Sequence, residues 1–318
     1  MKKYLMVLLI VGVMGNSPGV MAQDLTLMLD WFPNVDHLPV FVAQEKGYFD
    51  AEGIQVNILS PSDTSDALKL AVAGKVDLAV SYEPQTIIAA SEGLPVRVAG
   101  RLVAHPLTTL LFLKDKGYPS PSALSGKTIG YTVPGLMDVL LQAFAKINGI
   151  VDYTAVNVGF NIVPALTSGQ VDAVMGPFKT YETVTMAAKG IEAAYFELER
   201  WGIPDYDELI FICGVETRAK KSDAVQAFMR AVARGLEDAH HKPEAALQAY
   251  FKAVPDVDQA IERAAFERTR PYFAQTQVVD QERWQTFADF ALEHGLIDHP
   301  VNVATLMAPR PQGRRTPV

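Results

Sequence analysis

The sequence predicts an α/β protein of two lobes that are joined by a hinge of two chain crossings. Three observations lead to this prediction. Short apolar runs alternate with helical patterns over residues 25–220, which is typical of mainly parallel sheets with helices on both faces. The phrase AVAGKVDLAVSYEP at 71–84 returns in similar form as ALTSGQVDAVMGPF at 165–178. Two further apolar runs lie where the chain would cross from one lobe to the other and back.

The first lobe begins with an apolar strand over 25–30 and a helix over 38–46, which Gly47 ends. Residues 53–59, GIQVNIL, alternate apolar and polar side chains with the period of a strand. SDALKLAVAG then predicts a helix with Ser65 or Asp66 as its N-cap, and the strand VDLAVS follows. The order is strand, loop, helix, strand, helix, strand.

The second lobe repeats this order from residue 127. KTIGY predicts a strand, TVPG a loop, LMDVLLQAFAKING a helix and YTAVNVG a strand, and a further helix and strand follow over 161–176. The segments 101–118 and 206–219 predict the two crossing strands. The helical remainder, to about residue 297, is expected to return to the first lobe. The lobes are therefore assigned to 23–104 with 208–305, and to 105–207.

Four loops follow strands at equivalent places of the two lobes. They are DWFPN and SYEP in the first lobe, and TVPG and GPFKTYE in the second. Ligands of open α/β sheets bind beyond the carboxyl ends of the strands. We expect these loops to face one cleft, which the hinge lets close around a ligand.

The two ends of the chain predict an exported protein. Residues 1–22 have two lysines, an apolar run and a small-residue ending, the pattern of a secretory signal peptide cut after Ala22. The apolar run is shorter than the ~20 residues that span a membrane. Residues 306–318, rich in Pro, Gly and Arg, predict a disordered tail.

Charge and cysteine content exclude several classes of protein. The formal net charge is −8 and becomes −10 once Lys2 and Lys3 are removed with the signal peptide. Such an acidic chain is a poor partner for nucleic acids or anionic membranes. Cys213 is the single cysteine and lies in an apolar strand-like run, so we expect a buried, inert thiol.

Several phrases resemble one known family. They are DWFPNVDHLPVFVAQEKGYFDAEG, GKVDLAVSYEP, EGLPV, LSGKTIGY and SGQVDAVMGPFKTYE. They resemble the family that joins thiamine-pyrimidine binding proteins of ABC importers to fungal-type thiamine pyrimidine synthases. The resemblance implies the type II periplasmic binding protein fold.

The resemblance also separates the binding branch from the synthase branch. In the synthases a lysine holds pyridoxal phosphate and a histidine four residues later is consumed; here Ser81 and Gln85 stand at those places. A serine has no amine with which to form a Schiff base. The synthases carry a cysteine-rich iron motif and a glycine-rich phosphate loop, whereas this chain has Cys213 alone and TVPG. We therefore expect a binding protein without cofactor or metal, and no enzyme.

The ligand that the resemblance implies explains the residue types in the loops. An aminopyrimidine has a flat face, on which Trp31 can stack, and an edge that the amide of Asn34 can read. A carboxylate can accept paired hydrogen bonds from a ring nitrogen and an exocyclic amine. The expected ligand-binding residues are Trp31, Asn34, His37, Tyr82, Glu83, Thr132, Gly135, Phe178, Tyr181 and Glu182.

Structural roles stay open for several of these residues. Asn34 could serve as a turn or cap residue, Glu83 could stabilise a helix N-terminus, and Glu182 could lie on a solvated helix face. Gly135 borders a helix N-terminus that could bind an anion, although Pro134 lacks an N–H.

The expected function is that of a monomeric periplasmic receptor. It would capture hydroxymethylpyrimidine or its formylamino relative and deliver it to the permease of an ABC importer in the inner membrane. Two alternatives stay open: a synthase-like enzyme of the same fold, and a receptor for another solute such as a sulfonate, nitrate or a riboflavin-like ring.

Overall fold

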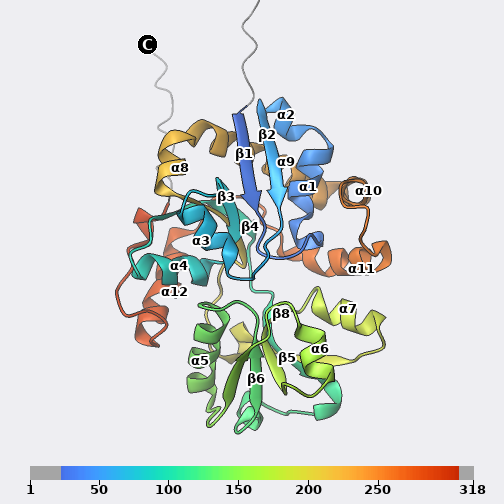
Figure 1. Ribbon diagram of the computed structural model, residues 1–318, viewed down its shortest axis with the longest axis vertical. Coiled ribbons are helices and arrows are strands. Elements are labelled where there is room, and N and C mark those ends of the chain that lie inside the picture. The colour runs from blue at the N-terminus through green and yellow to red at the C-terminus, as the bar shows by residue number, and fades with distance from the viewer. Residues whose placement is uncertain (1–22, 308–318) are drawn as a thin grey trace, which may run out of the picture.

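The structure is a computed structural model that describes residues 23–307. Two five-stranded sheets form the framework of the molecule (Figure 1). The expected signal peptide lies outside the described residues, as do residues 308–318 of the expected tail. The first sheet has the order β2-β1-β3-β10-β4. Its strands are β1 (Gln23–Met28), β2 (Ile54–Leu59), β3 (Leu78–Ser81), β4 (Val96–Val103) and β10 (Leu209–Gly214). The second sheet has the order β7-β6-β8-β5-β9. Its strands are β5 (Thr108–Leu113), β6 (Thr128–Tyr131), β7 (Thr154–Asn157), β8 (Ala173–Phe178) and β9 (Ala193–Glu197).

The two sheets have the same topology. In each, the first three strands of the lobe pair in parallel, and a strand that arrives from the other lobe pairs antiparallel on both of its sides. That arriving strand is β10 in the first sheet and β5 in the second. Four of the five strands in each sheet therefore point the same way, which confirms the expectation of mainly parallel sheets built on one repeated pattern.

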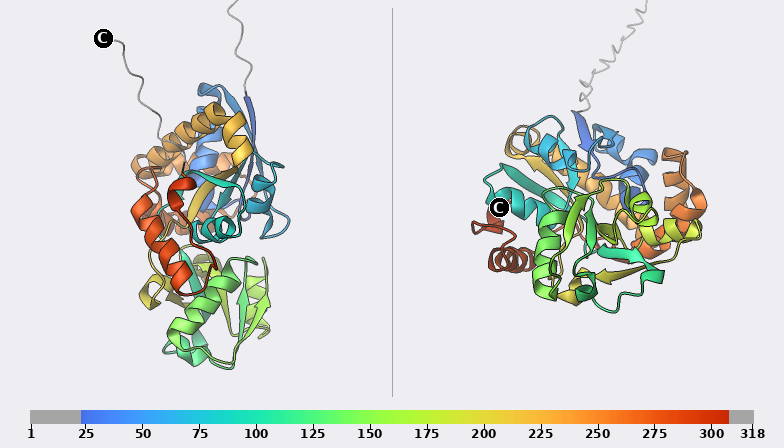
Figure 2. Two further views of the ribbon diagram at one scale, coloured as in Figure 1. Left: turned by 90° about the vertical axis from the view of Figure 1, so that its left-hand side faces the viewer. Right: turned by 60° about the horizontal axis from the view of Figure 1, so that its bottom comes forward.

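The chain crosses between the sheets twice. It leaves the first sheet after β4, runs through residues 104–107 and enters the second as β5. The segment 101–118, predicted as one crossing strand, is thus the end of β4, a short link, β5 and a turn of 3-10 helix at residues 114–116. The chain returns after β9 and η4 (Leu198–Trp201) along residues 202–208 and becomes β10. Figure 2 shows the resulting two lobes one above the other, so the prediction of two lobes with a hinge of two crossings is confirmed.

Helices cover the first sheet on both sides. Those from the first half of the chain are α1 (Leu38–Glu45), α2 (Tyr48–Ala51), α3 (Asp66–Val72) and α4 (Glu83–Ser91). Those from the C-terminal part are α8 (Val215–Lys220), α9 (Ser222–His241), α10 (Pro243–Ala253), α11 (Gln259–Thr269) and α12 (Gln281–Glu293), with η5 (Arg270–Tyr272) and η6 (Val303–Thr305). The expected helix after β1 is confirmed, and Gly47 ends it with φ 67°.

The long helix α9 packs closely against α1. A Cβ at Gly235 would lie 2.0 Å from the carbonyl oxygen of Pro39, so only glycine allows this approach of the two backbones. The ring of Phe228 stacks on Phe49 at 5.4 Å between centroids. Through these contacts, α9 packs on the helices that follow β1.

The second sheet is covered by α5 (Met137–Asn148), α6 (Ile162–Thr167) and α7 (Glu182–Ala188); η2 (Lys114–Lys116) follows β5, and η3 (Pro121–Leu124) packs against α5. Cys213, on β10, is fully buried. Burial raises the pKa of its thiol to about 11, which agrees with the expected inert cysteine.

Leu306 and Met307, the first two residues of the predicted disordered tail, pair with β4. Val98 donates its N–H to the carbonyl oxygen of Leu306 at 2.9 Å, and Met307 forms a bridge beside the same residue. The backbone pairing with β4 orders these two residues. Among residues 23–307, no helix is both long and apolar enough to cross a membrane.

Candidate functional site

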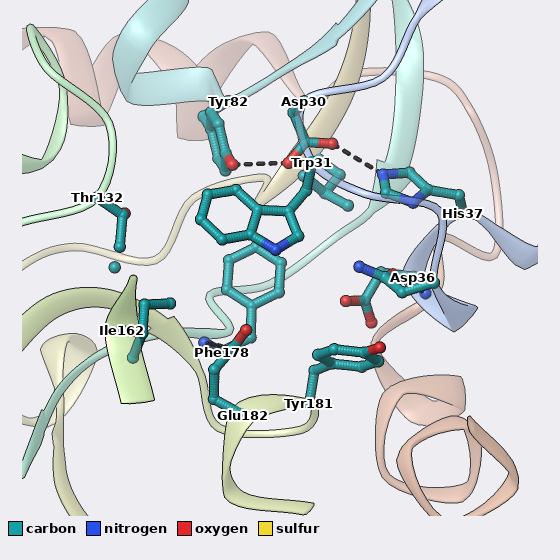
Figure 3. A pocket seen from close by; sticks show the side chains of 13 residues that line it. Asp30, Trp31, Asp36, His37, Tyr82, Thr132, Ile162, Phe178, Tyr181 and Glu182 are labelled. Carbon is teal, nitrogen blue, oxygen red and sulfur yellow. Dashed lines mark hydrogen bonds and ion pairs between the residues drawn. The ribbon is translucent and has the colours of Figure 1, made fainter. Parts of the chain in front are cut away.

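A cavity lies where the two lobes meet. Its walls come from the loops after β1, β3, β6 and β8, the four loops that the sequence places at strand ends, together with residues of α6 and β10 (Figure 3). The first lobe contributes Asp30, Trp31, Asn34, Asp36, His37, Tyr82 and Leu209; the second contributes Thr132, Ile162, Gly176, Phe178, Tyr181 and Glu182.

Most of the residues expected to bind ligand line this cavity. They are Trp31, Asn34, His37, Tyr82, Thr132, Phe178, Tyr181 and Glu182. Glu83 and Gly135 are not among the lining residues. Glu83 starts α4, and its carboxylate accepts the N–H of Asp207, in the second crossing, at 2.7 Å. The N–H of Gly135 donates to Asp138 at 2.7 Å, so a local carboxylate already occupies that helix N-terminus.

Asp30 organises the first-lobe wall. One of its carboxylate oxygens lies 2.8 Å from Nε2 of His37, and the other accepts the hydroxyl of Tyr82 at 2.6 Å. Burial, together with the charge of Asp30, raises the pKa of Tyr82 well above its usual value, so this hydroxyl stays protonated and donates. Among the described residues, Nδ1 of His37 has no hydrogen-bond partner.

The turn after Trp31 brings a second carboxyl group to the cavity. Asn34 is the N-cap of η1 (Val35–His37), and its side-chain oxygen accepts the N–H of Asp36 at 2.8 Å. Asp36 accepts the hydroxyl of Thr269 with one oxygen, while its other oxygen is buried without a partner in the described chain. Burial raises the pKa of Asp36 to about 7.

The second-lobe wall carries a third carboxyl group. Glu182 accepts the N–H of Phe178 at 2.6 Å, and burial raises its pKa to about 7. Close by, Gly176 has a φ of 128°, and a Cβ there would lie 2.0 Å from Oγ1 of Thr132. Glycine at this position therefore allows Thr132 to reach the cavity wall.

Aromatic rings from both lobes meet beside the cavity. Trp31 packs edge-on against Phe160, with 4.6 Å between ring centroids, and Phe32 lies 4.4 Å from the same ring. Trp31 and Phe32 belong to the first lobe and Phe160 to the second. Phe32 remains 50% exposed, so this aromatic contact lies between the cavity and solvent.

The cavity is narrow in this arrangement. About 370 Å³ of space lies between the lining atoms, solvent at the mouth included, but only about 20 Å³ is open to the centre of a water molecule. A ring-sized ligand therefore requires the lining side chains or the lobes to move apart.

The lining residues favour a planar, donor-bearing ligand. Four of them carry aromatic carbocycles and three carry carboxyl groups, and none in the described chain is lysine or arginine. Two of the carboxyl groups, those of Asp36 and Glu182, have pKa values near 7, so each can accept or donate a proton at neutral pH. No group of three metal-binding side chains occurs among residues 23–307.

The profile of the family described as NMT1/THI5 like matches residues 34–246. The chain belongs to the NMT1/THI5-like family. It is 35% identical to a Haemophilus influenzae protein named as a thiamine biosynthesis protein, over 91% of this chain and 92% of that one. It is 31% identical to the formylaminopyrimidine-binding protein of Halalkalibacterium halodurans, over 88% of each chain. It is also 29% identical to a 4-amino-5-hydroxymethyl-2-methylpyrimidine phosphate synthase of Aspergillus parasiticus, over 87% and 84%.

Solved structures show the same fold. The alkanesulfonate-binding protein SsuA of Xanthomonas axonopodis superposes with a TM-score of 0.71 at 17% identity, over 90% of this chain and 98% of that one. A Candida albicans protein with the generic periplasmic binding protein fold superposes with a TM-score of 0.72 at 16% identity, over 90% and 96%. This member of the NMT1/THI5-like family therefore has the periplasmic binding protein fold that the sequence resemblance implied.

Five lining residues were not expected from the sequence: Asp30, Asp36, Ile162, Gly176 and Leu209. Asp30 and Asp36 stand in the same loop as Trp31, so a search of that loop for every polar group would have included them. Leu209 lies on the returning strand β10, and its place depends on the pairing of β10 with β3, which local patterns do not show.

Proposed function

We propose that this chain binds an aminopyrimidine precursor of thiamine in the cavity between its lobes. The observation that carries the proposal is the composition of that cavity, with aromatic rings and carboxyl groups from both lobes. The relationship to a formylaminopyrimidine-binding protein at 31% identity supports it. Hydroxymethylpyrimidine and its formylamino relative are the proposed ligands.

The contacts follow from the chemistry of the ring. The face of the pyrimidine would stack on Trp31 and be enclosed by Phe178 and Tyr181. Its amine and ring nitrogens would pair with the carboxyl groups of Asp36 and Glu182. Because their pKa values lie near 7, one proton can be shared between a carboxyl group and a ring nitrogen.

The proposed role is capture for import. An exported receptor, cut after Ala22 and monomeric in the periplasm, would present the pyrimidine to an ABC permease in the inner membrane. Its lobes, residues 23–104 with 208–305 and residues 105–207, would close on the ligand, which shifts the population from open to closed. The surfaces around the cleft would then dock on the permease.

A synthase-like enzyme is the second candidate function, because relatives such as the Aspergillus protein carry a synthase name. Two residues disfavour it. Ser81 and Gln85, at the places where the resemblance puts the lysine and histidine of the synthases, bond to each other at 2.8 Å. Neither is a lining residue of the cavity. We therefore propose binding without catalysis.

Calorimetric titration tests the proposal. The chain, produced with and without residues 1–22, is titrated with hydroxymethylpyrimidine, formylaminopyrimidine, thiamine and an alkanesulfonate. One-to-one binding confined to the pyrimidines is expected. Binding of the sulfonate alone would favour a receptor for another solute. Visible absorbance on addition of pyridoxal phosphate, from a Schiff base, would favour the enzyme.

A further inference from the structure

One cavity residue is held from outside the cavity by the opposite lobe. Tyr181, beside α7 of the second lobe, donates its hydroxyl to Glu262 on α11 of the first lobe, at 2.7 Å between oxygens. Glu262 does not line the cavity and is 2% exposed. Helices α7 and α11 face each other across the junction of the lobes (Figure 1).

The carboxylate of Glu262 is assembled within the first lobe. Its second oxygen accepts the N–H of Val35 at 2.8 Å and the hydroxyl of Tyr250 at 3.0 Å. Val35 begins η1 and Tyr250 lies on α10, so neither bond crosses the cleft. When the lobes separate, Glu262 keeps these two donors and loses Tyr181 alone.

Helix α11 therefore contacts cavity residues of both lobes on the side that faces away from the cavity. Thr269, at its end, donates to Asp36 at 2.8 Å. Arg268 donates to Thr183 of α7 at 3.0 Å across the junction. The hydrogen bond from the N–H of Val35 to Glu262 holds the turn that contains Asn34 and Asp36. Helix α11 thus links cavity residues of the first lobe to α7 of the second.

We propose that Glu262 is a positioning residue and the acceptor of a closure latch. It orients the ring of Tyr181 against the cavity and stabilises the closed arrangement of the lobes through a buried hydrogen bond that crosses the junction. An effect of the latch on ligand affinity rests on the proposed pyrimidine ligand, whereas its effect on closure of the lobes does not require a ligand. Because this hydrogen bond exists only while the lobes are together, its loss shifts the balance toward the open state.

Two matched substitutions separate a latch from a merely structural carboxylate. Tyr181→Phe removes the donor that crosses the cleft and keeps the ring. Tyr250→Phe removes a hydroxyl from the same carboxylate within one lobe. Small-angle X-ray scattering of the unliganded full chain gives the radius of gyration of each, and thermal melting gives the stability.

The latch predicts a larger radius of gyration for Tyr181→Phe than for the wild type, and an unchanged radius for Tyr250→Phe even where its melting temperature falls. Equal radii for Tyr181→Phe and the wild type, or the same increase in both variants, would overturn the proposal. Pyrimidine titration of the same variants should show about tenfold weaker binding for Tyr181→Phe alone. If no pyrimidine binds while the radii still differ as predicted, the ligand is wrong and the latch stands.

Discussion

At the scale of single residues, Trp31 is the large ring that the first lobe presents to the cavity, and it touches Phe160 of the second lobe. Trp31→Ala should weaken hydroxymethylpyrimidine binding at least about tenfold, because both stacking and apolar burial are lost. Trp201→Ala is the matched control, since Trp201 packs on Phe196 away from the cavity. Calorimetry of both variants measures the effect, and equal affinity for Trp31→Ala and the wild type would remove Trp31 from the site.

Asp36 makes the stability of the free protein depend on pH. Burial is the largest cause that raises its pKa from 3.8 to about 7; Glu182 and Glu262 add to it, and His37 and Thr269 oppose it. When the pKa of a carboxyl group is higher in the folded protein than in the unfolded chain, the stability that it contributes is fully present below the pKa of the unfolded chain. For Asp36 this contribution to the free energy of unfolding is lost as the pH rises from about 4 to 7.

Asp36→Asn removes that dependence. We expect the variant to exceed the wild type in free energy of unfolding by roughly 1–3 kcal/mol at pH 8 and by much less at pH 5. Urea unfolding at the two pH values measures this difference. A difference that does not grow with pH would contradict the assigned cause.

At the scale of elements, two glutamates that begin helices have different surroundings. Glu83 begins α4 and bonds to the hinge at Asp207, whereas Glu182 begins α7 and lines the cavity. Burial raises the pKa of Glu83 well above its usual value, so glutamine resembles its protonated state. Glu83→Gln should leave pyrimidine affinity within about twofold, whereas Glu182→Gln should weaken it about tenfold by the loss of a charge-assisted hydrogen bond. If Glu83→Gln raised the dissociation constant more than Glu182→Gln, then Glu83 would belong to the ligand-binding site.

A buried carboxylate joins the two chain crossings of the hinge by hydrogen bonds. Glu208, in the second crossing, accepts the N–H of Leu107, in the first crossing, and both the N–H and the hydroxyl of Thr108, which begins β5. Glu208→Ala leaves these donors buried without partners, so we expect the free energy of unfolding to fall by about 3 kcal/mol. Glu208→Gln keeps an acceptor and should lose less. Guanidinium unfolding that shows no loss for Glu208→Ala would mean that water replaces the carboxylate.

Local sequence patterns are sufficient to predict the helices, the strands and their order, but they do not predict the direction of every side chain. Glycines such as Gly47 and Gly149 end helices in the left-handed conformation, and the repeated strand-loop-helix order identified the four loops of the cavity. The direction of Glu83 depends on β10, which pairs antiparallel with β3 from about 130 residues further along the chain. Glu262 lies on α11, outside the repeat, and its contact with Tyr181 depends on how the C-terminal helices pack. Such long-range packing leaves no local period in the sequence.

At the scale of the whole molecule, the two lobes touch through side chains on both sides of the cavity. Trp31 and Phe32 meet Phe160 on one side, and Tyr181 meets Glu262 on the other. A ligand that contacts both lobes would add free energy to the closed state alone, which is the condition for closure driven by binding.

A crystal structure of the chain with hydroxymethylpyrimidine tests the central claim most directly. We predict that the ring lies in the cavity, stacked on Trp31 of the first lobe and hydrogen-bonded to Glu182 of the second. A pyrimidine bound outside this cavity, or in contact with one lobe only, would contradict the account.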